Sequence, residues 1–285
     1  MAFEEEARPL LTAEEFRLLK ELLLDACGLQ LREDLKYVVE RRLWPRLEAL
    51  SLRDYSGYYR YLRFDARARE EVELAIELLV PHETYFFREP TQLDSFKREL
   101  LPMLHGQNSA SRRLRLWSAG CSSGEEPYTL AMLISESGLF EGWDVQIHGT
   151  DISRRMLTAA RAAEYGSSAL RTTTPAQLAR HFDPAGSGRF RVKAPLKNRV
   201  SFGHLNLLDE PGLKLLPRMD AIFCRNVLIY LEPAARRRVV HSFWEQLVAG
   251  GYLLLGHSES LLTFSTDFAL VQLKGDLVYR RPTGA

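Results

Sequence analysis

Residues 114–130, with the sequence LRLWSAGCSSGEEPYTL, constrain the fold of this chain more than any other segment. They begin with a short apolar run, break into a turn of serines and glycines, and continue with Glu125 and Glu126 ahead of Pro127. A strand, a glycine turn and a helix in this order predict the first crossover of a doubly wound α/β domain. Ligands of such domains bind at the carboxyl ends of the strands.

The glycines of this turn, Gly120 and Gly124, are spaced G-x-x-x-G, whereas dinucleotide-binding turns are spaced G-x-G-x-x-G. Both glycines allow the backbone to turn sharply and to approach a ligand closely. Glu125 and Glu126 stand where a pyrophosphate would meet the helix N-terminus, and their charge would repel it. The turn therefore favours a cationic or uncharged nucleoside, although a generic helix start with acidic residues explains the same pattern.

Composition excludes several classes of protein. The chain has 285 residues, 46% hydrophobic and 26% charged, which is ordinary for a globular enzyme of one or two domains. A net charge of +1 gives no general attraction to nucleic acid, and no apolar run approaches the ~20 residues of a membrane span. The acidic N-terminus lacks an apolar signal core, so we expect a cytoplasmic protein. Its widely spaced cysteines are expected to be free thiols, at Cys27, Cys121 and Cys224.

Residues 1–80 are expected to form an all-α N-terminal domain. Thr12 and Glu15 match a capping box ahead of a helix that Gly28 ends, and apolar residues recur at helical spacing beyond it. Ser51 is expected to cap the third helix of this domain.

One face of the second helix is basic and carries Lys36, Arg41, Arg42 and Arg46. Residues 36–63 hold seven basic and three acidic side chains. Such runs are most often solvated helix faces. The functional alternative is a docking surface for an acidic protein partner.

Residues 81–90, PHETYFFREP, are expected to link the helical domain to an α/β domain that spans residues 91–285. The aromatic residues of this linker predict an apolar latch between the domains. Arg88 lies inside that latch, and a charge in apolar surroundings needs a partner. An apolar latch alone therefore does not explain Arg88.

Two strand ends of the α/β domain carry candidate binding residues. Asp151 ends the second predicted strand, where an acidic side chain can accept hydrogen bonds from both ribose hydroxyls or cap the helix expected over residues 152–163. Arg225 and Asn226 end a later strand, a position suited to polar recognition. Residues 175–200, broken by prolines and glycines, predict a small antiparallel insertion.

Five phrases of the sequence, taken together and in order, resemble the chemotaxis receptor methyltransferases, the CheR family. They are HETYFFRE, WSAGCSSGEEPY, GTDIS, NLLD and FCRNVLIY, and the similarity extends through GHSESL at residues 256–261. The resemblance implies a Rossmann-like class I methyltransferase sheet with a small antiparallel β-subdomain, preceded by the all-α domain. It also implies S-adenosyl-L-methionine as the methyl donor.

The resemblance further implies a reaction and a partner. The reaction is methylation of glutamate side chains in the cytoplasmic domain of methyl-accepting chemotaxis receptors. Its products are glutamate 5-O-methyl ester and S-adenosyl-L-homocysteine, and it serves sensory adaptation. The implied docking surfaces are the basic helix face and, for a receptor C-terminal peptide, the β-subdomain. Neither nucleic acid nor membrane insertion is implied.

The motif match also implies site residues. The implied donor contacts are His82, Thr84, Arg88, Glu125, Asp151, Asn206, Leu207, Arg225 and Asn226. Among these, Glu125 would hold the amino-acid end of the donor and Asp151 its ribose, while Asn206 and Leu207 would flank the adenine. Tyr230 would lie beside the methyl group. His82 is a departure, because the family often has asparagine at that position.

The expected mechanism follows from the acceptor. A glutamate side chain with a pKa of about 4.3 is an anion at neutral pH, so transfer needs no general base and depends on positioning and desolvation. We expect Arg88 or Arg225 to orient this carboxylate and Tyr230 to donate a hydrogen bond to it. No metal is expected, because no ligand spacing relates the histidines His82, His148, His204 and His257.

Five other functions match the sequence less well or less specifically. A methyltransferase acting on RNA would favour a basic groove beside the site, whereas the basic excess lies in the helical domain. A small-molecule acceptor or a non-chemotaxis signalling receptor fits the same chemistry. A non-catalytic scaffold that binds donor or product fits poorly with the presence of Asp151, Arg225, Asn226 and Tyr230. A nicotinamide dehydrogenase fits least, because the turn lacks the diphosphate fingerprint.

Overall fold

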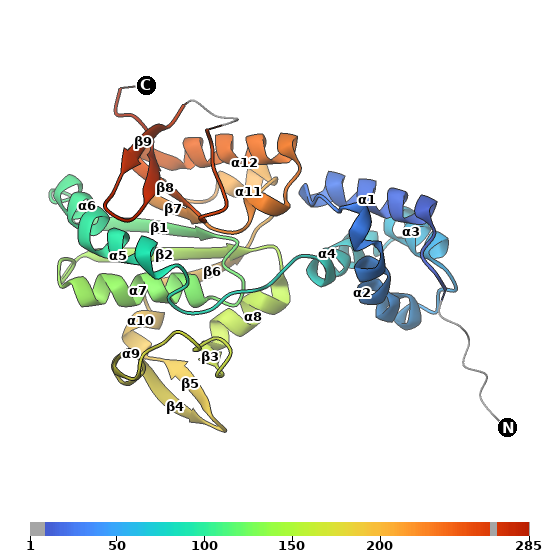
Figure 1. Cartoon of the computed structure of the whole chain (residues 1–285), viewed down its shortest axis with the longest axis horizontal. Coiled ribbons are helices and arrows are strands. Elements are labelled where there is room, and N and C mark those ends of the chain that lie inside the picture. Colours follow the sequence, from blue (N-terminus) through green and yellow to red (C-terminus); the bar gives the residue numbers. More distant parts are fainter. Residues whose placement is uncertain (1–8, 263–266, 285) are drawn as a thin grey trace. The chain divides into compact units, whose positions relative to one another are not determined.

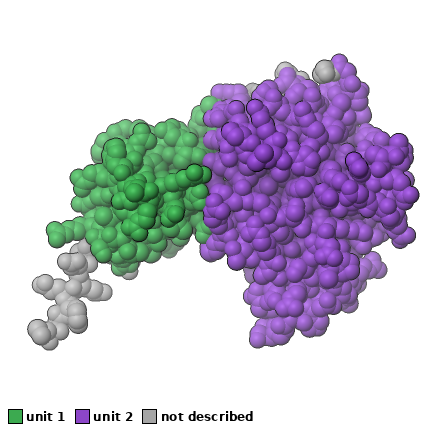
Figure 2. Space-filling model, turned by 180° about the vertical axis from the view of Figure 1, so that it is seen from behind, with its two compact units in different colours: residues 1–81, 230–235 green, residues 82–229, 236–285 purple. Residues whose placement is uncertain are grey.

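The computed structural model describes residues 9–262 and 267–284. The chain divides into two compact units, coloured green and purple in Figure 2. The helical unit comprises the chain through Pro81 together with residues 230–235, and the methyltransferase-fold unit comprises residues 82–229 and the chain from Arg236 onward. The linker is expected over residues 81–90. Pro81 groups with the helical unit, and residues 82–90 group with the second unit.

The helical unit contains the expected helices (Figure 1). The predicted capping box is confirmed, since Thr12 and Glu15 satisfy each other's backbone N–H groups and Gly28 ends the first helix in the left-handed conformation. The helices are α1 (Ala13–Cys27), η1 (Glu33–Leu35), α2 (Lys36–Ala49), α3 (Tyr55–Phe64) and α4 (Ala68–Leu79).

The expectation that Ser51 caps the third helix is wrong. Asp54 caps it, because its carboxylate accepts a hydrogen bond from Gly57 N at 2.6 Å. Ser51 instead terminates α2, with a φ of 54°. The N–H of Leu52 then reaches back to the carbonyl of Leu47 at 2.9 Å, the six-residue closure typical of a helix C-terminus.

Residues 230–235 complete the helical unit from a distant part of the sequence, which the sequence does not predict. Gln30 N donates to Tyr230 O at 2.8 Å, and Glu232 N donates to Gly28 O at 2.9 Å. An isolated antiparallel bridge joins Leu29 to Leu231 between them. The loop after α1 therefore receives its backbone hydrogen bonds from this segment.

The predicted Rossmann-like sheet is confirmed, and it is a mixed sheet of seven strands with the order β6-β2-β1-β7-β8-β10-β9 (Figure 1). The pairs β1–β2, β1–β7, β2–β6 and β7–β8 are parallel, whereas β10 runs antiparallel to β8 and β9. The strands are β1 (Arg113–Ala119), β2 (Asp144–Asp151), β6 (Val200–His204), β7 (Met219–Cys224), β8 (Leu247–Leu255), β9 (Ala269–Gln272) and β10 (Leu277–Arg280).

The two faces of β1 pack against different layers, as the two-residue period of a strand requires. Leu116 belongs to the cluster that includes Leu130 of α7, whereas the neighbouring Trp117 meets Phe243 of α12 edge-on at 5.3 Å. The helices in this part of the chain are α5 (Pro90–Ser95), the π-helix η2 (Phe96–Leu100), α6 (Leu101–Gln107), α7 (Glu125–Ser137), α8 (Arg154–Ala162), α11 (Glu210–Leu213), η3 (Leu228–Tyr230) and α12 (Pro233–Gln246). The end of η3 and the start of α12 fall within residues 230–235, which group with the helical unit.

A separate three-stranded antiparallel sheet, with order β3-β5-β4, forms the small subdomain. Its hairpin strands β4 (Phe182–Gly186) and β5 (Arg189–Val192) lie in the region predicted as an insertion, with α9 (Pro175–His181) and α10 (Ala194–Lys197) beside them in sequence. The third strand, β3 (Glu164–Tyr165), comes from further upstream and pairs with β5.

A buried ion pair holds the helical unit together. Glu71 of α4 is 4% exposed and accepts both guanidinium N–H groups of Arg46 at 2.8 and 2.6 Å, as well as the hydroxyl of Tyr58 at 2.8 Å. Arg42 donates to the last carbonyls of α4, those of Leu78 and Leu79. Two of the four predicted docking cations, Arg42 and Arg46, thus bind α2 to α4.

Removing one partner of a buried pair leaves the other charge uncompensated, at a cost of about 3–5 kcal/mol. We therefore expect Glu71→Ala to lower the free energy of unfolding by about that amount. Glu70→Ala, a change at the exposed neighbouring position, should shift it by no more than about 0.5 kcal/mol. Urea denaturation followed by circular dichroism measures both, and equal stability of the two variants would contradict the role of the pair.

Candidate active site

The candidate site lies where β1, β2 and β7 end. These three strands are parallel neighbours with β1 in the centre, so their carboxyl ends meet at one edge of the sheet. The turn at residues 120–124 follows β1, Asp151 ends β2, and Arg225 follows β7. The linker joins this edge through its backbone, because Ser122 Oγ donates to His82 O at 3.2 Å and Phe87 N donates to Thr129 Oγ1 at 3.2 Å.

The glycines of the turn are required by packing within the protein. A Cβ at Gly120, whose φ is 80°, would lie 2.5 Å from Cγ2 of Val227. A Cβ at Gly124, whose φ is 93°, would lie 2.9 Å from Cβ of Ala160. Both positions need the left-handed conformation and the missing side chain. The sharp turn that these glycines predict is confirmed, and close packing against neighbouring elements is a second reason for them. Their close approach to a ligand stays a prediction.

Asp151 ties the turn to the second strand. Its carboxylate accepts from Ser122 N at 2.7 Å and from Ser153 N at 2.8 Å, and burial raises its pKa. The alternative that Asp151 caps the following helix is wrong. Ser153 caps α8 by accepting from Met156 N at 3.1 Å, since the helix begins only at Arg154. Each oxygen of Asp151 keeps a second lone pair that can accept from a hydroxyl group.

Glu125 is a buried carboxylate at the first position of α7. It is 3% exposed, accepts from Ser123 Oγ at 2.8 Å, and burial raises its pKa to about 7. Within the described residues, no cationic side chain lies at ion-pair distance from it. Its neighbour Glu126 differs, since it accepts from Ser118 Oγ at 2.7 Å and from Arg225 at 3.1 Å. Glu125 is thus suited to bind an ammonium group supplied by a ligand.

Arg225 is occupied by protein groups. Its side chain is 3% exposed and pairs with Glu126 at 3.1 Å and with Glu89 at 3.0 Å. It also donates to the carbonyl of Arg88 at 2.6 Å. The guanidinium therefore connects the end of β7 to the start of α7 and to the linker.

Arg88 is half-buried, and its guanidinium has lighter contacts. It donates to Glu83 O at 2.9 Å and lies 5.7 Å from the centroid of the Tyr85 ring. Its two neighbours, Phe87 and Glu89, have φ values of 56° and 59°, a conformation that side chains adopt at a cost of about 1–3 kcal/mol each. Such strain is typical of segments that are held in one geometry for function.

Asn226 has an unusual environment. Its φ is 59°, and its side-chain oxygen is buried without a hydrogen-bond partner. A buried carbonyl oxygen of this kind is available to a donor on a ligand. Asn206 lies near Asp151 along the chain path, because Leu205 N donates to Asp151 O at 3.1 Å. Asn206 Oδ1 accepts from Leu208 N at 3.0 Å, which orders the turn that contains Leu207.

Glu259 organises the turn after β7, and sequence reasoning assigned it no role. Its carboxylate accepts four backbone N–H groups at 2.7–3.2 Å, from Asn226, Val227, Gly256 and Ile229. Burial raises its pKa, whereas these four hydrogen bonds oppose the increase. The one sequence feature that could have pointed to Glu259 is its position in the phrase GHSESL, residues 256–261.

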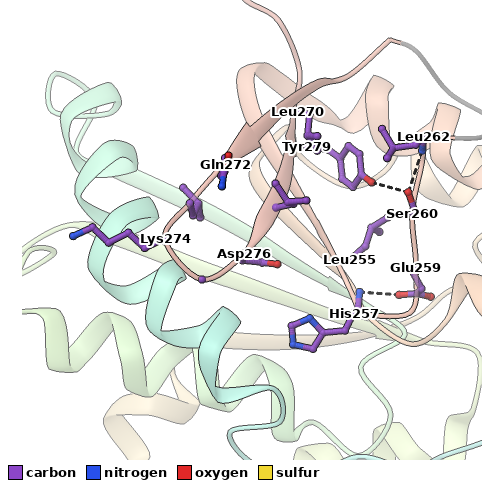
Figure 3. Close-up of a pocket in the computed structure, with 14 residues that line it drawn as sticks. Leu255, His257, Glu259, Ser260, Leu262, Leu270, Gln272, Lys274, Asp276 and Tyr279 are labelled. Carbon is purple, nitrogen blue, oxygen red and sulfur yellow. Dashed lines mark hydrogen bonds between the residues drawn. The ribbon is translucent and has the colours of Figure 1, made fainter.

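Glu259 also lines a pocket of about 610 Å³ beside the end of β8 (Figure 3). Tyr279 of β10 also lines this pocket. Its hydroxyl accepts a hydrogen bond from Leu261 N and is hydrogen-bonded to Ser260 Oγ. Apolar side chains of the β9–β10 hairpin, including Leu270 and Leu277, complete the wall.

Tyr230 ends η3 and is 36% exposed. It belongs by its contacts to the helical unit, so its place beside the methyl group stays a prediction. Across residues 9–262 and 267–284, no group of three or more His, Cys, Asp or Glu side chains is arranged to hold a metal ion. In the same part of the chain, no helix has both the length and the apolar character needed to cross a membrane.

The fold is a mixed sheet of seven strands, and Asp151 is the last residue of its second strand. Residues 82–276 match the family described as CheR methyltransferase, SAM binding domain, and residues 14–80 match its all-alpha domain. The chain therefore belongs to the CheR methyltransferase family and is an S-adenosylmethionine-dependent methyltransferase.

Relatives in several bacteria are similar over nearly their whole length. Chemotaxis protein methyltransferase 1 of Pseudomonas aeruginosa is 36% identical over 274 residues, which cover 93% of this chain and 97% of that protein. Chemotaxis protein methyltransferase 2 of Vibrio cholerae is 33% identical over 273 residues, covering 95% and 94%. The chemotaxis protein methyltransferase of Borreliella burgdorferi is 34% identical over 255 residues, covering 88% and 89%.

The residues present fit S-adenosylmethionine. Among the described residues, Glu125 offers a buried carboxylate with no cationic side chain at ion-pair distance, which suits the methyl donor's amino group. In the same part of the chain, the side-chain oxygen of Asn226 is buried with no hydrogen-bond partner. A hydrogen bond to a charged group contributes about 1.5–3 kcal/mol, more than one between neutral groups, so we expect the carboxylate to contribute more than the amide oxygen.

Because the pKa of Glu125 is about 7, its ionised fraction falls as pH decreases through neutrality. We expect the affinity for S-adenosylhomocysteine, which carries the same amino group, to decrease from pH 7.5 to pH 6. Glu125→Gln should lower the affinity at pH 7.5 by roughly tenfold and abolish this pH dependence. Isothermal titration calorimetry measures both.

Glu141→Gln, at an exposed position, is the control and should keep the affinity and pH profile of the unmodified protein. An unchanged profile in Glu125→Gln would mean that another group binds the amino end of the donor.

Proposed function

We propose that this protein transfers a methyl group from S-adenosylmethionine to glutamate side chains of methyl-accepting chemotaxis receptors, in the cytoplasm. The products are glutamate 5-O-methyl ester and S-adenosylhomocysteine. The observation that carries the proposal is the buried Glu125 carboxylate, which no described cationic side chain meets at ion-pair distance, in a domain that matches the CheR family. The names of the relatives, which are chemotaxis protein methyltransferases, support the receptor as acceptor.

S-adenosylmethionine supplies an electrophilic methyl group on a sulfonium sulfur. The acceptor carboxylate, whose pKa in water is about 4.3, is already an anion and attacks the methyl carbon as the carbon–sulfur bond breaks. The protein's residues bind and orient the two reactants. Glu125 binds the amino end of S-adenosylmethionine and Asp151 binds its ribose. Asn206 and Leu207 flank the adenine, and Asn226 Oδ1 accepts a hydrogen bond from an N–H or O–H group of S-adenosylmethionine.

Arg88 and Arg225 have different contacts, so we propose different roles for them. Arg225 already pairs with Glu89 and Glu126, so we assign it the task of holding the linker at the Arg88 carbonyl. Arg88 has no carboxylate partner within the described residues and is the better candidate to orient the acceptor. Tyr230 remains the proposed hydrogen-bond donor to that carboxylate. His82 and Thr84 of the linker are proposed donor contacts, with His82 O accepting from Ser122.

Receptor docking is proposed at two places. On the basic helix face, Arg42 and Arg46 are engaged with α4, so Lys36 and Arg41 are the cations left to meet an acidic partner. The β-subdomain is the second proposed surface, for a receptor C-terminal peptide. Its hairpin carries Arg189 and Arg191, of which Arg191 pairs with Glu164.

Arg88→Ala should decrease kcat by about a hundredfold, because a misplaced acceptor loses the near-attack geometry. The affinity for S-adenosylhomocysteine should change by no more than a few fold. Transfer of a labelled methyl group to a receptor cytoplasmic fragment measures kcat, and a fragment with its acceptor glutamates replaced by alanine gives the background.

Arg98→Ala is the matched control, because the Arg98 side chain is 76% exposed and pairs with Asp94 on its own helical segment. Normal turnover in Arg88→Ala would exclude its assigned role. An unmodified enzyme that binds S-adenosylhomocysteine but does not methylate the receptor fragment would exclude the proposed acceptor.

A further inference from the structure

The loop between β3 and α9, residues 166–174, holds the linker at several points. Phe86 N donates to Ala169 O at 3.0 Å, and Thr172 Oγ1 donates to Phe86 O at 2.5 Å. The ring of Phe86 is fully buried and meets Tyr165 of β3 and Phe182 of β4 edge-on, at 4.7 and 5.0 Å. The backbone of the linker is therefore attached to the subdomain next to Arg88.

Arg171 of this loop holds the two linker residues that Arg88 touches. Its guanidinium donates to Ser168 O at 2.9 Å within its own loop and pairs with Glu83 at 3.1 Å. It also lies 3.6 Å from the centroid of the Tyr85 ring. Arg88 lies 5.7 Å from the same ring and donates to the Glu83 carbonyl.

The stacking on Tyr85 is the stronger of these two contacts. The ion pair with Glu83 is exposed, with side chains 39% and 73% accessible, and exposed pairs contribute little because water screens them. A guanidinium over an aromatic ring gains attraction from the ring face and keeps the planar groups parallel. Arg171 therefore limits the rotation of Tyr85, the surface against which Arg88 rests.

We propose that Arg171 is a positioning residue for methyl transfer, which fixes the Glu83–Tyr85 portion of the linker so that Arg88 meets the acceptor carboxylate. This rests on the role of Arg88 in the proposed function. It also joins the β-subdomain to the catalytic linker, because the loop that carries Arg171 leads directly from β3 into α9.

Arg171→Ala should decrease kcat by roughly tenfold and change the affinity for S-adenosylhomocysteine by less than about twofold, since a small misplacement of a reacting group is costly. Tyr85→Leu should have the same effect, whereas Tyr85→Phe, which keeps the ring face, should retain activity. Arg180→Ala is the matched control, an exposed arginine of α9 that pairs with Glu136 and not with the linker.

In an Arg88→Ala background, Arg171→Ala should cause no further loss, because its effect passes through Arg88. An equal tenfold loss in both backgrounds, or unchanged kcat in Arg171→Ala, would overturn the inference. Activity of the unmodified enzyme on the receptor fragment tests the proposed function separately.

Hydrogen exchange supplies a readout that needs no turnover. A peptide covering residues 83–88 should exchange faster in Arg171→Ala and in Tyr85→Leu than in Tyr85→Phe or Arg180→Ala. Unchanged exchange in Arg171→Ala would refute the positioning role even if no receptor fragment proved to be a substrate.

Discussion

The site depends on one buried guanidinium. Arg225 faces the carboxylates of Glu89 and Glu126 and the carbonyl of Arg88, and it thereby joins a strand end, a helix start and the linker. Taking these charges out of water is unfavourable unless each finds its partners, so the arrangement is stable only when all three segments are in place. The geometry of Arg88 is consequently a property of the assembled unit.

The site combines carboxylates that have different tasks. Asp151 and Glu259 accept several backbone N–H groups and fix the turns around them. Glu126 neutralises Arg225. Burial raises the pKa of Glu125 to about 7, and the hydrogen bond from Ser123 and the charge of Arg171 only partly oppose this increase. The folded protein thus has one buried carboxylate that can bind a positively charged ligand. Burying this carboxylate lowers the stability of the protein without ligand.

Strain accompanies this arrangement. Phe87, Glu89, Ser122 and Asn226 all have left-handed φ values, and all of them lie in the linker or in the turns that follow β1 and β7. Each of them is held by a hydrogen bond: Phe87 by Thr129 and Glu89 by Arg225. In the two turns, Ser122 is held by Asp151 and Asn226 by Glu259. Strained backbone persists when its surroundings determine it in this way, and here the strained residues lie in or beside the candidate site.

The sequence by itself predicted the main strands of the large sheet, most helices and a candidate site at the strand ends with the carboxylates of Glu125 and Asp151, because period, capping and turn chemistry act over a few residues. It did not predict β3, which pairs with β5 from further upstream. Only the tertiary structure decided that Gly120 packs on Val227, that Arg46 pairs with Glu71, that residues 230–235 join the helical unit and that Arg225 grips the linker. These contacts join residues 25 to about 200 positions apart, and no local pattern records which buried charges will meet.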